Sequence, residues 1–142
     1  MPDKRLAPIA EALQARDMPL RTLTREDECV GYAAGFRAAG GRPLVLFQCS
    51  GLGNALNAIG SLALPYGYGF PLILSMRGTL GEANPAQVPL GRSSAAMLAL
   101  LGIQSFSVRA VADVAAVVAG AARLAYDARQ VVAIILEPGL ED

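Results

Sequence analysis

The sequence contains no histidine and no tryptophan, and only two cysteines occur among its 142 residues. Without histidine, the chain cannot by itself supply serine–histidine or cysteine–histidine catalysis, and it lacks the commonest zinc ligand. Cys29 and Cys49 have neither a CxxC spacing nor a metal-ligand spacing, and both lie among apolar neighbours. We interpret both as buried thiols. Any chemistry must therefore use carboxylates, backbone dipoles, a cofactor or another chain.

Net charge is also absent, because 12 basic residues balance 12 acidic ones. A nucleic-acid-binding surface would show a basic excess. No charged residue occurs from Pro43 to Met76, yet Gln48, Asn54 and several prolines and glycines interrupt this span, so it contains no run of ~18 apolar residues that would cross a membrane. The N-terminus has early charge but no long apolar core of a secretion signal. We expect a cytoplasmic protein that binds neither nucleic acid nor membrane.

Apolar runs alternate with helical patterns along the chain, and its length fits one domain, residues 1–142. Runs that are apolar on both faces and joined by helices predict a parallel sheet covered on both sides. We therefore expect a three-layer α/β/α sandwich with a mostly parallel sheet of about five strands. The predicted strands are 43–49, 71–76, 105–108 and 131–136, with a short extended piece at 20–23; the predicted helices are 6–15, 25–39, 54–64, 93 or 94 to 101, and 111–127.

Local signals predict where two of these helices begin. Thr24 is a candidate N-cap, with Asp27 three residues later in a position like that of a capping box. Ser93 or Ser94 is the candidate cap of the helix that ends near Leu101. The segment between the second strand and this helix, residues 77–91, is predicted to be a loop because it carries glycines and prolines.

Two features at strand and helix ends are candidates for a ligand site. The turn SGLGN at residues 50–54 follows an apolar strand, where open α/β folds bind ligands, and its glycines let a ligand approach the backbone. Leu56 occupies the third-glycine position of a dinucleotide motif and no lysine follows, so the turn is not a nucleotide phosphate loop. Glu26 lies in the first turn of a helix rich in small residues. By themselves, the first feature is more simply explained as a tight turn, and the second as an acid that complements a helix dipole.

Four motifs in a fixed order give these residues a more specific interpretation. They are TREDE at 24–28, QCSGLGN at 48–54, SMRGTLGE at 75–82 and PAQVPLGR at 85–92. Together they resemble the pyrimidine-binding domain of thiamine diphosphate enzymes, and most closely the alpha subunits of the sulfopyruvate and phosphonopyruvate decarboxylases. That family usually opens with an extra strand and part of a helix before the region matching Leu6, so this chain looks shortened at its N-terminus. Some relatives have histidine where Met76 stands.

The resemblance implies a role for each matched residue. It assigns Glu26 to a hydrogen bond with N1′ of the cofactor's aminopyrimidine ring, which makes Glu26 the expected catalytic residue. It places the residues of the second motif around the cofactor, namely Gln48, Ser50, Gly51, Gly53 and Asn54. It gives the sulfonate or phosphonate of the substrate three candidate ligands, Arg77, Gln87 and Arg92, with Glu82 as a possible partner of either arginine. Solvated surface charge is the competing interpretation of both arginines.

The chain has no GDG motif, which thiamine diphosphate enzymes use with a downstream asparagine to bind the diphosphate and its Mg²⁺. The resemblance therefore implies that this chain holds no metal and that a separate beta subunit holds the Mg²⁺. It implies a hetero-oligomer that also has alpha–alpha contacts and acts on a small anionic 2-oxo acid. Two alternatives stay open: a thiamine diphosphate enzyme that decarboxylates or ligates another 2-oxo acid, and a non-catalytic α/β ligand-binding or assembly module.

Overall fold

The sheet has four strands, and all of its pairings are parallel. A computed structural model describes residues 3–139, and in them the strand order is β1-β2-β4-β3. The strands are β1 (Val45–Gln48), β2 (Pro71–Ser75), β3 (Gln104–Val108) and β4 (Val132–Leu136). β1, β2 and β4 coincide with predicted apolar runs, whereas β3, with the sequence QSFSV, mixes polar residues with Phe and Val. The prediction of an α/β fold with a parallel sheet is confirmed.

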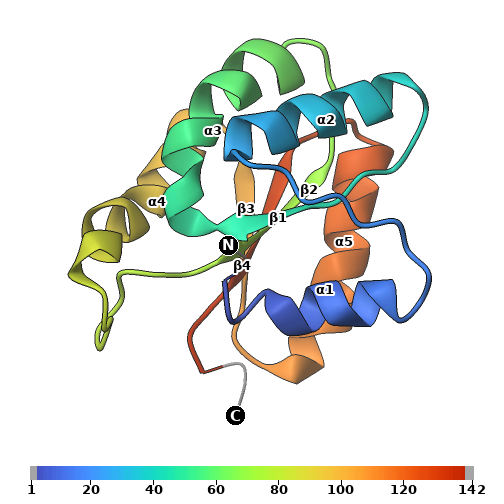
Figure 1. The fold of residues 1–142 in the computed structure, drawn as a ribbon. Coiled ribbons are helices and arrows are strands. Elements are labelled where there is room, and N and C mark those ends of the chain that lie inside the picture. Colours follow the sequence, from blue (N-terminus) through green and yellow to red (C-terminus); the bar gives the residue numbers. More distant parts are fainter. Residues whose placement is uncertain (1–2, 140–142) are drawn as a thin grey trace.

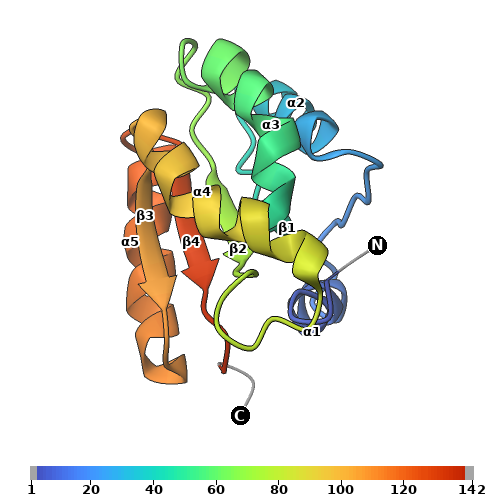
Figure 2. The ribbon, with the colours of Figure 1, turned by 90° about the vertical axis from the view of Figure 1, so that its left-hand side faces the viewer.

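Five helices cover the two faces of this sheet, as Figures 1 and 2 show. α2, α3 and α4 lie on one face, and α1 and α5 lie on the other. Their bounds are α1 (Ala7–Gln14), α2 (Glu26–Ala38), α3 (Leu52–Ala58), α4 (Val88–Leu100) and α5 (Val114–Tyr126). The three predicted layers are therefore present. No helix within residues 3–139 is long and apolar enough to cross a membrane.

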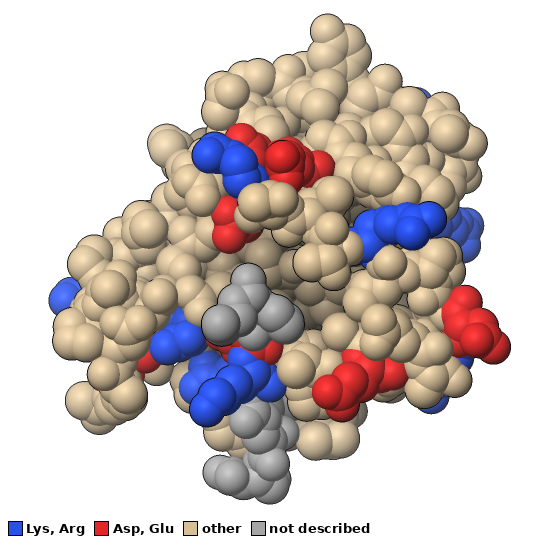
Figure 3. Space-filling model, viewed as in Figure 1, with Lys and Arg blue, Asp and Glu red and all other residues tan. Residues whose placement is uncertain are grey.

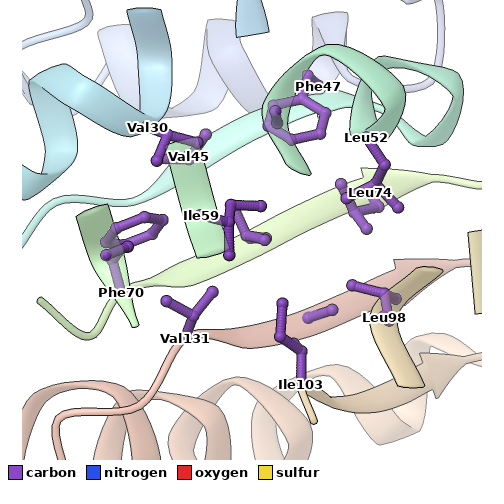
Figure 4. Packing of buried hydrophobic residues seen from close by; sticks show 14 of the residues in the cluster. Val30, Val45, Phe47, Leu52, Ile59, Phe70, Leu74, Leu98, Ile103 and Val131 are labelled. Atoms are coloured by element: carbon purple, nitrogen blue, oxygen red, sulfur yellow. The ribbon is translucent and has the colours of Figure 1, made fainter. Parts of the chain in front are cut away.

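The larger hydrophobic core lies between the sheet and the α2–α3–α4 layer (Figure 4). Val30 of α2, Phe47 of β1 and Leu98 of α4 meet there, and Leu52 and Ile59 are fully buried. A smaller core under α1 and α5 includes buried residues such as Leu6, Ala121 and Ile134. Because the larger core ties α2 and α3 to the end of β1, it fixes the elements that carry the candidate site residues.

The strands differ strongly in burial. Every residue of β2 is buried, and β4 is buried up to its last residue, because both strands have a neighbour on each side. β3 is an edge strand whose first four residues are exposed. The sheet has four strands in the described residues rather than about five. The short extended piece predicted at residues 20–23 is not a strand: these residues lie in the segment between α1 and α2, and no described strand pairs with them.

The start of α2 differs by one residue from the predicted cap. Arg25, not Thr24, is the N-cap residue, with extended backbone angles, and Glu28 rather than Asp27 closes the capping box. The Glu28 carboxylate accepts hydrogen bonds from the backbone N–H groups of Thr24 and Arg25, both at 3.0 Å. Asp27 instead pairs with the Arg25 side chain. The predicted carboxylate three residues after the N-cap is thus present, but the N-cap and this carboxylate each lie one residue later than predicted.

α4 begins at Val88, several residues before the predicted caps. A 3₁₀ turn, Pro85–Gln87, leads into it, and a proline lies in the first helical turn, where its missing N–H costs nothing. The hydroxyls of Ser93 and Ser94 donate to backbone carbonyls four residues earlier, at 2.9 and 3.0 Å. Both serines are therefore inside the helix, and the predicted loop 77–91 ends at residue 84.

Two further helices are entered through 3₁₀ turns. Cys49–Gly51 forms such a turn directly after β1, so α3 starts two residues before the predicted position 54. α3 then continues into a π-helical turn, Ile59–Ala63, which accounts for the predicted extent to about residue 64. A 3₁₀ turn at Val111–Asp113 precedes α5 in the same way.

Candidate functional site

The carboxyl ends of β1 and β2 lie side by side, and most of the predicted site residues follow these two strand ends. Gln48 at the end of β1 is in register with Ser75 at the end of β2. After β1 the chain turns at Cys49–Gly51 into α3, and after β2 it enters the loop that contains Arg77. This is the edge at which open α/β sheets bind ligands.

Glu26 and Asn54 form a direct contact at this edge. The Asn54 Nδ2 donates a hydrogen bond of 2.8 Å to Glu26 Oε2, joining the start of α2 to the first turn of α3. The other carboxylate oxygen, Oε1, makes no hydrogen bond to any residue in 3–139. Asn54 is exposed and Glu26 is partly exposed. The pair is therefore accessible, with one carboxylate oxygen ready to bind a further group.

Gly51 lies directly beneath this pair. A Cβ atom on Gly51 would lie 2.5 Å from Glu26 Cγ and 2.8 Å from both its Cδ and Oε1. Glycine is therefore needed here so that the Glu26 side chain can lie over the turn. Gly53 is different, because a Cβ there would meet only the methyl groups of Leu90 at 3.7 and 3.8 Å, an ordinary contact. The structure thus places Gly51 at the carboxylate and Gly53 toward α4.

A second polar cluster is centred on Arg77. Its Nε and Nη2 donate to the two oxygens of Glu82 at 2.8 and 2.6 Å, a bidentate ion pair. Its Nη1 donates to Asp3 Oδ2 at 3.2 Å and to Gln48 Oε1 at 2.9 Å. The side chains of Asp3 and Glu82 are only 5% and 8% exposed. Arg77 is therefore committed to partners within this chain.

This cluster also changes the protonation of its members. Glu82 accepts from Arg77 and, in addition, from the backbone N–H groups of Gly78 and Asn84. The Arg77 guanidinium, helped by these N–H groups, holds the pKa of Glu82 well below its usual range. The hydrogen bonds that Arg77 donates to Glu82 in turn raise the pKa of Arg77, with Asp3 adding to the effect. Both groups therefore stay charged, and the loop after β2 is held by a charged pair.

Gln48 joins the Arg77 cluster to the turn after β1. Its Oε1 accepts from Arg77, and its Nε2 donates to Ser50 Oγ and to Gln87 Oε1. The structure therefore brings Gln48, Ser50, Arg77 and Gln87 into one connected network. The sequence had divided these residues between cofactor and substrate. Here they bind one another.

Arg92 stands apart from this network. It is exposed on α4 and makes no hydrogen bond or ion pair within residues 3–139. The preceding residue, Gly91, packs so closely on the loop that an added Cβ would lie 2.2 Å from the carbonyl oxygen of Arg77. Arg92 thus emerges where α4 meets the loop after β2. Of the two arginines among the three predicted anion ligands, it is the one whose guanidinium has no partner in residues 3–139.

Three contributors to this region have weaker signals in the sequence. Asp3 is far from Arg77 along the chain, so no spacing indicates their contact. Glu82 was noted only as a possible partner of an arginine. Cys49 is buried, and its Sγ accepts from the backbone N–H of Arg77 at 3.2 Å.

The second cysteine, Cys29, is partly exposed rather than buried. Its partial burial raises the pKa of its thiol, and nearby Glu26 adds to the effect, so Cys29 is not an activated thiol.

The residues at this edge match a known family. A family model described as "Thiamine pyrophosphate enzyme, N-terminal TPP binding domain" matches residues 1–78. The chain belongs to this family. The matched region contains Glu26, the turn after β1 and Arg77. The resemblance drawn from the four motifs is therefore confirmed at the level of the family.

Three curated proteins are similar to parts of this chain. "Sulfopyruvate decarboxylase subunit alpha" of Methanococcus maripaludis is 34% identical over 122 residues, which are 86% of this chain and 73% of that protein. The protein of the same name from Methanothermobacter thermautotrophicus is 43% identical over 91 residues, 64% of this chain and 55% of that protein. "Sulfopyruvate decarboxylase" of Methanosarcina acetivorans is 44% identical over 79 residues, 56% of this chain but 20% of that protein. The chain thus spans from a fifth to about three quarters of these relatives.

The donor set at this edge fits the pyrimidine end of thiamine diphosphate and not its metal end. A carboxylate with one unpaired oxygen, lying over a glycine and oriented by an amide, suits hydrogen bonding to a ring nitrogen. Within residues 3–139 no group of three or more cysteine, aspartate or glutamate side chains is placed to hold a metal ion. The fit is therefore to half of the cofactor.

Proposed function

We propose that this chain is the pyrimidine-binding subunit of a two-subunit thiamine diphosphate-dependent 2-oxo acid decarboxylase. The observation that carries the proposal is the Glu26–Asn54 pair over Gly51, located in the region that matches the family's TPP binding domain. The cofactor, when bound, supplies an electron sink for the loss of CO₂ from a 2-oxo acid. Glu26 is the proposed catalytic residue: its carboxylate hydrogen-bonds N1′ of the aminopyrimidine and holds or releases a proton there.

The turn after β1 would complete the cofactor's pyrimidine site. Asn54 orients the Glu26 carboxylate, and Gly51 leaves it room. Ser50 and Gln48 form the wall toward β2, since Gln48 donates to Ser50. Gly53 is proposed to line the cleft through its exposed backbone. These are binding roles, and the proton chemistry in this chain rests on Glu26.

We propose sulfopyruvate as the substrate, with phosphonopyruvate as the closest variant. The relatives whose names specify a substrate all name sulfopyruvate. A sulfonate or phosphonate suits a guanidinium with free N–H donors, and Arg92 offers one. Gln87, next to the start of α4, adds a neutral donor. Arg77 is proposed to contribute to substrate binding by holding the loop, because its own donors are engaged.

The proposed partner is a beta subunit that holds the diphosphate and Mg²⁺. Two of these relatives are named as alpha subunits, which supports a separate partner. The relative from Methanosarcina acetivorans is named without a subunit, and the region similar to this chain is only 20% of it. The surface over α3, and along α2 beyond its first turn, is almost free of charged side chains in Figure 3. Tyr32 and Phe36 are exposed there, and Gly31 and Gly35 face open space. This surface is proposed to contact the beta subunit or a second alpha subunit.

The proposal is tested by co-expressing the chain with its candidate partner and assaying CO₂ release with thiamine diphosphate and Mg²⁺. Sulfopyruvate, phosphonopyruvate and pyruvate are compared as substrates, and the isolated chain is the control. We expect turnover only by the complex and preference for a substrate with the added anion. Turnover of pyruvate alone, or carboligation, would support a different thiamine diphosphate enzyme. Failure of the complex to bind the cofactor would favour a non-catalytic module.

A further inference from the structure

A second polar cavity lies at the opposite end of the sheet from the candidate site. It has a volume of about 400 Å³, and its lining comes from the segments that precede β1, β2 and β4. These include Arg37 and Gly40 before β1, Tyr68 before β2, and Asp127 and Arg129 before β4. A five-residue strand spans ~17 Å, so the length of the strands separates this cavity from the end of the sheet at which Glu26 lies. Nothing in the proposed reaction uses it.

Two guanidinium groups line this cavity, and a third lies beside one of its lining residues, Tyr126. Arg37 and Arg129 line it, and Arg42 lies 5.3 Å from the centre of the Tyr126 ring, against which Arg37 also lies at 5.4 Å. None of the three forms an ion pair with a carboxylate of residues 3–139, although Asp127 is part of the lining. The three guanidinium groups at Tyr126 and the cavity carry more positive charge than Asp127 offsets, so the arrangement favours an added anion.

The neighbouring tyrosine does not neutralise these charges. The Tyr126 hydroxyl donates to the carbonyl of Pro43 at 3.0 Å and is therefore protonated. Burial raises the pKa of Tyr126, and Arg37 and Arg42 oppose this effect only in part. Its ring thus serves as a neutral surface on which two guanidinium groups lie.

Free hydrogen-bond donors remain on each arginine. Arg37 uses Nη1 and Nη2 for the carbonyls of Gly41 and Tyr126, while its Nε is buried without a partner. Arg129 uses Nε and Nη2 for the carbonyls of Gly67 and Tyr66, which leaves its Nη1 unbonded. Arg42 makes no hydrogen bond through its guanidinium within residues 3–139. A buried donor such as Arg37 Nε is normally satisfied, so this position calls for a hydrogen-bond acceptor.

The backbone at Arg129 is also unusual. Its φ is +58°, in the left-handed region that favours glycine or asparagine, yet an arginine occupies the position. Arg129 lines the cavity, and its two hydrogen bonds to carbonyls of the segment before β2 hold the side chain there. A residue kept in a costly conformation while its charged group faces a cavity suggests a binding role.

We infer that this cavity at the amino ends of the strands binds a small dianion of the phosphate or sulfonate class through Arg37, Arg42 and Arg129. The ligand would be held by charge-assisted hydrogen bonds from these guanidinium groups. The volume exceeds that of a bare phosphate, so the anion can carry a small organic group. The inference is independent of the proposed decarboxylase function.

The test measures inorganic phosphate binding to the full chain by isothermal titration at constant ionic strength. Arg92→Gln is present throughout, so that an anion bound at the proposed substrate site does not contribute. The test variants are Arg42→Gln and Arg129→Gln, since Arg42 makes no hydrogen bond and the Arg129 contacts are at the surface. The control is Arg109→Gln, an exposed residue after β3 at the other end of the sheet.

We expect saturable binding that weakens at least ~10-fold in each test variant and is unchanged in the control, since each loses a charge-assisted contact. Circular dichroism and thermal unfolding check that every variant is folded. Absence of phosphate binding in the millimolar range would overturn the inference. Equal affinity in all variants would overturn it too, because the anion would then bind elsewhere.

Discussion

The two polar clusters at the carboxyl end of the sheet are built in opposite ways. Glu26 has one side-chain partner, Asn54, in an exposed position, and keeps one oxygen free. Arg77 uses four hydrogen bonds to three side chains, and its acidic partners are almost fully buried. A group that exchanges protons must remain accessible to its ligand, whereas a group that holds a loop is best kept paired. We therefore assign the proposed chemistry to Glu26 and a structural role to the Arg77 cluster.

The largest expected effect comes from Glu26→Gln. Glutamine keeps the size and the hydrogen bond to Asn54 but cannot exchange the proton. We expect exchange of the cofactor's thiazolium C2 proton, measured by hydrogen–deuterium exchange in the complex with the partner subunit, to slow by at least ~100-fold.

Glu28→Gln is the matched control for this change. Glu28 accepts two backbone hydrogen bonds at the start of α2, and an amide oxygen still accepts them. We expect a stability loss of at most ~1 kcal/mol and little change in proton exchange. If Glu28→Gln abolished exchange and Glu26→Gln did not, the assignment of the catalytic carboxylate would be wrong.

The next effect concerns Gly51→Ala. The new methyl group would collide with the flexible Glu26 side chain rather than with backbone, so the fold survives while the carboxylate is displaced. Displacement of a catalytic group by about 1 Å is worth up to ~100-fold in rate. We therefore expect kcat to fall by ~10- to 100-fold with little change in melting temperature. Gly53→Ala keeps the backbone contact proposed for Gly53, and its methyl group meets only Leu90 at an ordinary distance, so we expect it to lower kcat less than Gly51→Ala does.

A smaller, selective effect is expected for the two arginines. Arg92→Gln should raise KM for sulfopyruvate by ~10-fold and leave KM for pyruvate nearly unchanged, because it loses a charge-assisted contact to the sulfonate. Arg77→Gln should lower thermal stability and affect both substrates alike, since it leaves Asp3 and Glu82 as nearly buried, unpaired carboxylates. Equal KM changes for both substrates in Arg92→Gln would remove Arg92 from the substrate site.

The smallest effect is a pH dependence of stability. The pKa of Glu82 is held below its ordinary value of 4.5, so its contribution is present above that pH and is lost as the pH falls through the lowered folded-state value. We expect the melting temperature of the wild type to fall more steeply below pH 4.5 than that of Glu82→Gln. Parallel pH profiles would show that the Arg77–Glu82 pair does not contribute to stability in this range.

The sequence alone predicted the parallel sheet, because apolar runs such as 71–76 and 131–136 are bounded by turn residues. It also predicted the proximity of Glu26 to the turn at 50–54, through the family's motifs. The sequence did not show whether Thr24 or Arg25 is the N-cap of α2, since both precede a turn rich in carboxylates. The backbone angles of the structure identify Arg25. Nor did the sequence predict that Arg77 pairs with Asp3, because contacts between residues far apart in the sequence leave no local pattern. The amino-end arginines were missed for the same reason.

The strand order has a consequence for how this protein is made. β4 is the last strand in the sequence, yet it lies between β2 and β3, and both of those strands hydrogen-bond to it. During synthesis, β3 therefore has no partner, and the fully buried β2 is open on one side, until residues 132–136 have left the ribosome. Sheets completed by such distant segments form slowly and expose unpaired edges meanwhile. We expect nascent chains that stop before residue 132 to depend on chaperones, and this sheet to close only once β4 has been made.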